Sequence, residues 1–422
     1  MYFAQCPSFN AVFFANLIAF WWHEIVTSRV KLVFEVMSRL KSYLLVLLMI
    51  RMLASCKPVP VSHWFPVTPQ EHYERDLLRA KMEKTVAGQT WFRVSEAVLS
   101  DSVFSVAPYK ERFFLGDSVP AQAIRLNIPE GRKLVITPNR EDGDTTSRLF
   151  VELYKVKSNG KAQRLDYLRQ DGNSLTFINY EKDTLLLRLQ TGLNEKLAVS
   201  LSLTTLPSLA FPVAGRGTSD VISFWGADRD GGIRSHEGID IRAKRGTPVV
   251  ASESGFVTQA GTNNLGGKIV FLSSLSNPYS LYYAHLDSQL VSTGQRITLG
   301  DTLGLVGNTG NAITTSPHLH FGIYQRGEGA VNPLPFIDDR PEKSPGLPEM
   351  SEWFGDTVSL KRKANLFTSA QFQKTGLIRT LPANTVVRII GEMSKGYRVQ
   401  LDDGTKGYIP TVPLQPYQRQ PS

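Results

Sequence analysis

The stretch Ser235-His236-Glu237-Gly238-Ile239-Asp240-Ile241 decides how the rest of the sequence is interpreted. Gly238 disfavours the interior of a helix, and the isoleucines on either side of Asp240 alternate with it as in a β-strand. On an extended chain, residues four apart return to the same face. We therefore expect His236 and Asp240 to point in the same direction while the isoleucines enter a core.

The segment Pro317-His318-Leu319-His320-Phe321 has the same alternation. It predicts a strand with both histidines on one face and the two apolar side chains on the other. A further histidine, His285, lies in the aromatic run Tyr282-Tyr283-Ala284-His285-Leu286, which is also typical of a strand. Four of the seven histidines thus fall within residues 206–340.

Histidine and aspartate in this combination are the donors of a catalytic zinc site. Such a site needs three protein ligands and one open position for water, and neighbouring histidines can then transfer protons. A single histidine on a strand is more often a structural residue, and a His-x-His pair occurs by chance. The hypothesis of a metal centre rests on finding all of these residues in one glycine-rich segment.

Residues 211–335 resemble the lysostaphin/LytM-type family of zinc metallopeptidases, which cut peptide cross-links in bacterial cell walls. The family motif, His-x-x-x-Asp followed far downstream by His-x-His, stands here as His236, Asp240, His318 and His320. Supporting matches are Gly246-Thr247-Pro248-Val249, Tyr283-Ala284-His285-Leu286 and Gly307-Asn308-Thr309-Gly310.

This resemblance implies an antiparallel β metallopeptidase domain that holds one Zn2+ through His236, Asp240 and His320. It makes His285 and His318 the catalytic pair and peptidoglycan peptides the substrate. The implied activity is that of a zinc endopeptidase that uses a metal-activated water. Some family members have a tyrosine shortly before the first zinc histidine that assists the oxyanion. This chain has no tyrosine in that loop, so the role stays unassigned; the residues there include Trp225, Asp228, Arg229 and Asp230.

Two alternatives stay open. Some members of the family have lost their metal ligands and activate other wall hydrolases without hydrolysing anything themselves, although this chain keeps every motif residue. The other alternative is an enzyme held inactive because the N-terminal region or its tether covers the cleft.

The fold class expected for the whole chain is mostly β. Short alternating runs with turn signals between them predict an N-terminal β-sandwich-like domain, and a small strand-rich module ends the chain. A short helix is expected to begin at Pro69. The expected segments are 1–55 (leader), 56–90 (tether and helix), 91–205 (sandwich-like domain), 206–340 (metallopeptidase domain), 341–352 (linker) and 353–418 (C-terminal module).

The C-terminal module resembles the bacterial SH3-like domains that accompany cell-wall hydrolases. The resemblance rests on Gly396-Tyr397, an Asp403-Gly404 hairpin turn and Gly407-Tyr408-Ile409-Pro410. It implies a small β-barrel that binds the wall or a peptide. The alternative is a barrel that only stabilises the protein.

Residues 37–56 have the charged start, short apolar run and small-residue end of a secretory signal. Leu53-Ala54-Ser55-Cys56 resembles the lipobox of bacterial lipoproteins, so Cys56 is expected to carry a lipid that anchors the protein to a membrane. Translation is then expected to start at Met37, and Cys6 to be absent from the mature protein. The alternative is a membrane anchor in residues 1–36 with Cys56 unmodified. The residue after Cys56 is Lys57 and not the aspartate that resembles an inner-membrane retention signal. The protein is therefore expected on the periplasmic side of the outer membrane.

The net charge of +9 does not indicate a nucleic-acid-binding protein. Residues 206–340 carry 10 basic and 11 acidic side chains, and no dense basic stripe occurs elsewhere. Two cysteines cannot form a disulfide framework.

Overall fold

The computed structural model describes residues 67–141, 146–182 and 184–417. The predicted leader, its start at Met37 and the predicted lipid site at Cys56 lie outside these residues, as does Cys6. Among the described residues, no helix is long and apolar enough to cross a membrane. The described residues from Thr68 onward belong to one compact unit.

The helix expected at Pro69 is confirmed as α3 (Pro69–Arg79). Thr68 caps it by accepting a hydrogen bond from the backbone N–H of Glu71, and the Glu71 side chain accepts one from the backbone of Thr68. This reciprocal capping box satisfies two N–H groups that would otherwise lack partners.

A second helix, α4 (Val86–Ala97), corrects the expectation that strands begin at Trp91. Trp91 lies in this helix, and its exposed fraction is 1%. Its indole N–H donates to the carbonyl of Thr191 at 2.9 Å, so the helix is held on the adjacent β-sheet. The alternation read from Trp91 onward was too short to distinguish a strand from a helix with one buried face.

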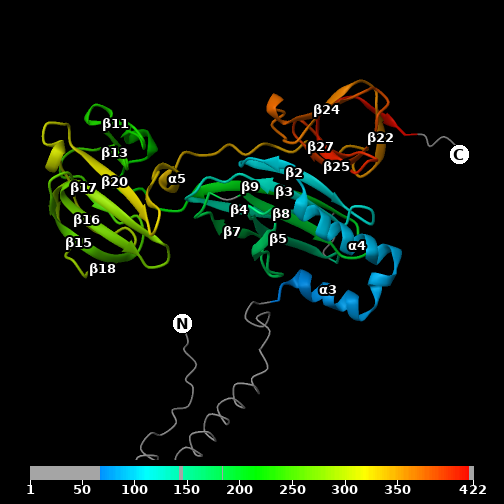
Figure 1. The fold of residues 1–422 in the computed structure, drawn as a ribbon, viewed down its shortest axis with the longest axis horizontal. Coiled ribbons are helices and arrows are strands. Elements are labelled where there is room, and N and C mark those ends of the chain that lie inside the picture. The colour runs from blue at the N-terminus through cyan, green and yellow to red at the C-terminus, as the bar shows by residue number, and fades with distance from the viewer. Residues whose placement is uncertain (1–66, 142–145, 183, 418–422) are drawn as a thin grey trace, which may run out of the picture. The chain divides into compact units, whose positions relative to one another are not determined.

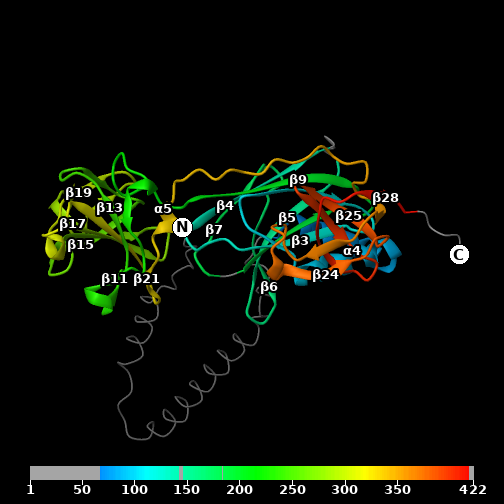
Figure 2. The ribbon, with the colours of Figure 1, turned by 90° about the horizontal axis from the view of Figure 1, so that it is seen from above.

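The β-rich region that follows is a sandwich of two sheets, as predicted. One is the five-stranded sheet β1-β3-β8-β5-β6, and the other contains β2-β9-β4-β7 (Figures 1 and 2). Apolar residues from both sheets share one buried core, which includes Phe113, Ile124, Leu187 and Leu201. The strands are β1 (Phe104–Ser105), β2 (Tyr109–Leu115), β3 (Ala121–Leu126), β4 (Arg132–Arg140), β5 (Leu149–Val156), β6 (Ala162–Tyr167), β7 (Leu175–Ile178), β8 (Thr184–Thr191) and β9 (Leu197–Pro207).

The glycine-rich segment forms a 10-stranded sheet whose main path is β10-β13-β20-β17-β16-β15-β18. Its central strands pair antiparallel, and its own apolar core contains Ile239, Ile241, Leu319 and Phe321. The elements are β10 (Val221–Ser223), β13 (Ile239–Arg242), β14 (Pro248–Val250), β15 (Gly255–Asn263), β16 (Gly267–Ser274), β17 (Tyr279–Gln289), β18 (Arg296–Ile297), β19 (Thr302–Val306), β20 (His318–Gln325), β21 (Gly329–Val331) and α5 (Leu334–Ile337). A separate two-stranded sheet consists of β11 (Asp228–Arg229) and β12 (Arg234–Ser235).

The C-terminal region contains the hairpin expected around Asp403-Gly404. Its strands β26 and β27 pair antiparallel, and Gly404 has a φ of 83°, which suits a glycine in a tight turn. The strands are β22 (Thr357–Leu360), β23 (Ala364–Phe367), β24 (Leu377–Leu381), β25 (Val386–Met393), β26 (Gly396–Gln400), β27 (Lys406–Pro410) and β28 (Leu414–Pro416).

The C-terminal strands are continuous with the sandwich. Strand β25 pairs antiparallel with β2, so that Arg112 lies opposite Glu392 in one 11-stranded sheet. Beside this pairing, the guanidinium of Arg398 makes two hydrogen bonds of 2.7 Å with Glu111, and both side chains are fully buried. The last module is therefore joined to the sandwich by strand pairing and by buried charge.

Candidate metal centre

His236 and Asp240 lie in different parts of the secondary structure, one in a turn and the other in a strand. Asp240 lies in β13 between two fully buried isoleucines, as the alternation predicted. His236 lies before this strand, in the turn between β12 and β13. Gly238 belongs to that turn, and a Cβ atom there would lie 2.6 Å from His320 Cε1. The glycine is therefore needed because the chain passes directly against a functional side chain.

Strand β20 brings the second histidine motif to Asp240. The antiparallel register places Asp240 opposite His320, and His320 in turn lies opposite Ala284 of β17. Leu319 and Phe321 are fully buried on the other face. The predicted division of this strand into a histidine face and an apolar face is thus confirmed.

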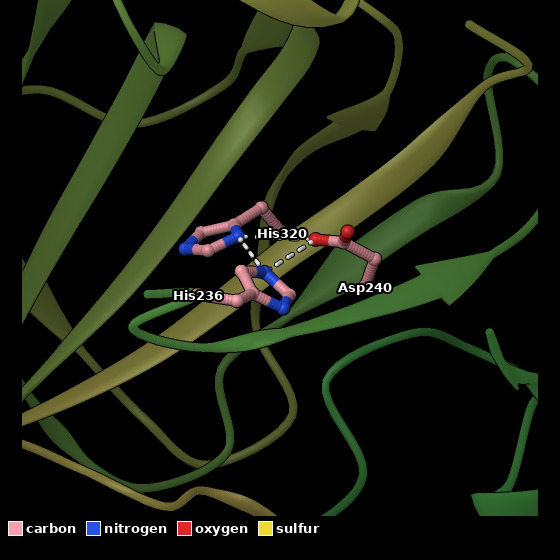
Figure 3. Close-up of side chains that lie close together, drawn as sticks. All are labelled: His236, Asp240 and His320. Carbon is pink, nitrogen blue, oxygen red and sulfur yellow. Dashed lines mark hydrogen bonds and ion pairs between the residues drawn. The ribbon is translucent and has the colours of Figure 1, made fainter. Parts of the chain in front are cut away.

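His236, Asp240 and His320 converge on one point (Figure 3). Asp240 Oδ1 lies 3.1 Å from His236 Nε2 and 3.0 Å from His320 Nδ1, and these two nitrogens are 3.0 Å apart. One donor atom from each residue lies within 4.8 Å of the others. Two imidazoles and a carboxylate fit a zinc ion in their donor chemistry, and they could leave its fourth position open.

The electrostatic environment favours the protonation states that bind metal. Burial by itself would raise the pKa of Asp240, but the interactions with His236 and His320 outweigh it and lower the pKa. Burial lowers the pKa of His320, and the attraction to Asp240 offsets this only in part. A charged carboxylate beside a neutral imidazole is the state that a metal ion requires.

The backbone fixes the tautomer of His236. Its Nδ1 lies 2.9 Å from the carbonyl oxygen of Phe224, which can only accept a hydrogen bond. Nδ1 therefore carries the proton, and Nε2 presents its lone pair to Asp240 and His320. Hydrogen bonds of this kind orient metal-binding histidines.

His285 and His318 lie beside this cluster. Their ring centroids are 5.1 Å apart, and the centroid of His285 is 5.8 Å from that of His320. The Nδ1 atoms of His285 and His318 each lie 2.8 Å from a backbone carbonyl, of Thr309 and Ser316 respectively. In each neutral ring, Nε2 is therefore the nitrogen that can accept a proton.

His285 has an unusual backbone. Its φ is 62°, in the left-handed region, and the ladder between β16 and β17 shifts register next to it. An irregularity of this kind redirects a side chain and is frequent at functional sites. Burial, followed by the repulsion of His318 and His320, lowers the pKa of His285 to about 4.

An open cleft of about 1040 Å³ is lined by the three converging donor residues and by His285 and His318. Every described residue that lines the cleft comes from positions 229–324, so the described part of residues 68–205 contributes none. Several residues that line the cleft have no role that the sequence predicts. Strands whose partners the sequence does not reveal carry Phe271, Tyr282, Tyr324 and Asn263. In the sequence, Arg229 is only a residue of the loop before His236.

Comparison with known proteins identifies the segment. Residues 234–333 match peptidase family M23. An L-Ala--D-Glu endopeptidase of Bacillus subtilis is 37% identical over 139 residues, which are 30% of this chain and 42% of that protein. The peptidoglycan DD-endopeptidase ShyC of Vibrio cholerae is 39% identical over 97 residues, 23% of this chain and 22% of that protein.

The murein hydrolase activator NlpD of Escherichia coli is also similar, at 31% identity over 137 residues, which are 32% of this chain and 33% of that protein. The chain thus spans less than half the length of each of these relatives. Residues 234–333 form a domain of peptidase family M23.

Proposed function

We propose that this protein is a zinc-dependent endopeptidase that hydrolyses peptide cross-links of bacterial peptidoglycan. The observation that carries the proposal is the convergence of His236, Asp240 and His320 in an open cleft with two further histidines beside them. The similarity to a B. subtilis endopeptidase and to a V. cholerae peptidoglycan DD-endopeptidase supports a cell-wall peptide as the substrate.

His236 Nε2, Asp240 Oδ1 and His320 Nδ1 are the atoms that would hold the ion, because they face one another at about hydrogen-bond distance. Zinc in such a site polarises the scissile carbonyl and makes water more acidic. The protein supplies the geometry: three donors on two paired strands and one turn.

His285 and His318 would transfer the proton that hydrolysis moves from water to the departing amine. Attack of water on the peptide carbonyl releases one proton, and the departing amine needs one. A neutral imidazole whose Nδ1 is bonded to a carbonyl accepts that proton at Nε2 and returns it to the amine. The second histidine donates a hydrogen bond to the negatively charged oxygen of the tetrahedral intermediate. Because each Nδ1 is held by a backbone carbonyl, Nε2 can accept the proton in the neutral ring, and the donor to the oxygen would be the ring that carries a second proton at Nε2.

A second candidate function is that of a non-hydrolytic activator of another wall hydrolase. The similarity to the activator NlpD supports it. An activator of the kind that has lost its ligands needs neither the three converging donors nor the neighbouring histidine pair. Their presence in one cleft favours the hydrolase.

The test measures bound zinc and the release of soluble peptides from purified cell wall. The purified protein should contain one zinc ion and should digest the wall, whereas His236→Ala and Asp240→Ala should lose zinc and activity together. His72→Ala is the matched control, since His72 is exposed on α3 far along the chain from the motif. Wild-type protein that binds no zinc and releases no peptide would favour the activator.

We further propose that the mature protein begins at a lipid-modified Cys56 and lies on the periplasmic side of the outer membrane. The lipobox-like sequence before Cys56 and the proline-containing stretch after it support an anchor followed by a tether. Mass spectrometry of the mature N-terminus tests this. An unmodified Cys56 preceded by residues 1–55 would contradict it.

We propose that residues 353–418 are an SH3-like module that binds wall peptides. The paired strands β26 and β27 around the Asp403-Gly404 turn support this. Binding of the wall by catalytically inactive protein, compared with the same protein carrying Tyr397→Ala on strand β26, tests it. Equal binding would leave the module with a stabilising role alone.

A further inference from the structure

One basic side chain contacts the metal-ligand cluster. Arg229 ends the short strand β11, and its Nη2 atom donates to Asp240 Oδ2 at 2.6 Å and to Ser223 Oγ at 2.9 Å. The Arg229 side chain is 35% exposed, and it lines the cleft. The carboxylate that it contacts is 11% exposed, so the ion pair lies partly out of water.

Arg229 makes the two oxygens of Asp240 unequal. Oδ1 faces His236 and His320, at 3.1 and 3.0 Å. Oδ2 faces the guanidinium. A free carboxylate could present either oxygen, or both, to a cation. A charge-assisted hydrogen bond to one oxygen fixes the rotation of the group and leaves the other oxygen directed at the histidines.

The same arginine links the support of Asp240 to that of His236. Ser223 Oγ, which accepts from Arg229, lies 3.3 Å from His236 Nδ1. Ser223 also lies opposite Asp240 in the pairing of β10 with β13. Arg229 and Ser223 thus contact Asp240 and His236 on the sides that face away from the point where the three donor atoms converge. Outer contacts of this type control the orientation and affinity of metal ligands.

We infer that Arg229 is a positioning residue of the metal centre: by holding Asp240 Oδ2, it makes the carboxylate offer Oδ1 alone. This inference rests on the proposed zinc-dependent function. A carboxylate that binds through one oxygen occupies one position on the ion, and the position that its second oxygen would take stays free for water and substrate. A lysine could supply the charge. Its ammonium lacks the planar geometry of the guanidinium, so it would restrict the rotation of the carboxylate less strongly.

The experiment compares zinc affinity by competition with a chelator in wild-type protein, Arg229→Gln and Arg229→Lys. Arg216→Gln is the matched control, since Arg216 pairs with Asp220 in the same domain and its side chain is 34% exposed. We expect zinc binding to weaken about 10- to 100-fold in Arg229→Gln, less in Arg229→Lys and not in Arg216→Gln. If the zinc affinity of Arg229→Gln stays within about twofold of the wild-type value, the inference is overturned, because that change is far smaller than the expected loss of about 10- to 100-fold.

Absorption spectra of the cobalt-substituted proteins provide a readout that a merely structural role would not change. A carboxylate that binds through both oxygens raises the coordination number, so the visible bands of cobalt in Arg229→Gln should become weaker, as expected for a five-coordinate ion. An unchanged spectrum in folded Arg229→Gln would contradict the role assigned to Oδ2. If Arg229→Gln does not fold, the comparison of Arg229→Lys with Arg216→Gln decides in the same way.

The outcomes separate this inference from the proposed function. Wild-type protein that binds zinc and digests the wall, together with an Arg229→Gln protein of equal zinc affinity and unchanged cobalt spectrum, would remove the role of Arg229 and leave the function intact. Wild-type protein without zinc would remove both.

Discussion

At the residue scale, His285 lies close to the three donors, but the proposed function gives it a different role. Its Nδ1 is held by the carbonyl of Thr309, and its ring lies beside His318. We predict that His285→Ala lowers peptide hydrolysis by about 10²- to 10⁴-fold, the usual contribution of a general acid or base, and keeps bound zinc. Turnover on cell-wall fragments and zinc content measured on the same samples check this. Full activity in His285→Ala would refute the assignment.

Gly238 is constrained by the space next to His320. An added Cβ atom would lie 2.6 Å from His320 Cε1 and 2.7 Å from Nε2. We predict that Gly238→Ala displaces the imidazole and weakens zinc binding by at least about tenfold, since a small error in donor position is costly. Chelator competition measures the effect. Gly261→Ala is the control, because the nearest atom to its Cβ would be 3.8 Å away; equal zinc affinity in the two variants would contradict the prediction.

At the element scale, the ladder β13-β20-β17 builds the site. The sequence could predict that His318 and His320 share one face, because that follows from the alternation within one strand. It could not predict that Asp240 lies opposite His320, because cross-strand register depends on contacts between residues 80 positions apart. The resemblance to known peptidases supplied the pairing that the pattern alone left open.

Three other features of the elements could not be predicted from the sequence. The left-handed backbone of His285 depends on an irregularity in strand pairing, and nothing in the residue type requires it. The second half of helix α4, residues 91–97, lies in the segment for which the sequence predicts strands, because short alternating runs do not distinguish a strand from a helix with one buried face. Arg229 was visible as a residue of the loop, but its contact with Asp240 depends on how the β11–β12 hairpin folds back on β13.

The loop after β19 holds the carbonyl that orients His285. Gly310 in this loop has a φ of +71°, and a Cβ there would lie 2.3 Å from the backbone nitrogen of Gly267. We predict that Gly310→Ala displaces Thr309, lowers hydrolysis more than tenfold and leaves zinc bound. Gly300→Ala is the matched control: its φ of +88° gives similar backbone strain, and its Cβ would meet nothing within 4 Å. Comparable activity losses in the two variants would show that strain, and not displacement of Thr309, is responsible.

At the scale of the whole molecule, the C-terminal module shares a sheet and a buried ion pair with the sandwich. Glu111 and Arg398 are both fully buried, and Arg398 also donates to the carbonyl of Ala123. The sequence predicts a separate module. It gives no local signal for the pairing of β2 with β25, because this pairing joins segments about 280 residues apart. The shared sheet makes the folding of these two parts interdependent.

We predict that Glu111→Gln lowers the free energy of unfolding by about 3–5 kcal/mol, because it leaves the Arg398 charge buried without its partner. Denaturant-induced unfolding followed by tryptophan fluorescence measures the change. Asp403→Asn is the control, since it breaks an ion pair with Arg379 whose side chains are about half exposed, and such exposed pairs contribute little to stability. A loss no larger for Glu111→Gln than for Asp403→Asn would show that the buried pair does not hold the module in place.

The proposed activity is hydrolysis of cross-linked peptides with a metal ion held by His236, Asp240 and His320. The most direct measurement is mass analysis of products from defined cross-linked wall fragments incubated with zinc-loaded protein, with chelator-stripped protein and with stripped protein resupplied with zinc. We predict that one peptide bond is cut, with addition of one water, only in the first and third samples. Intact cross-links in all three samples, or equal cleavage without zinc, would contradict the account.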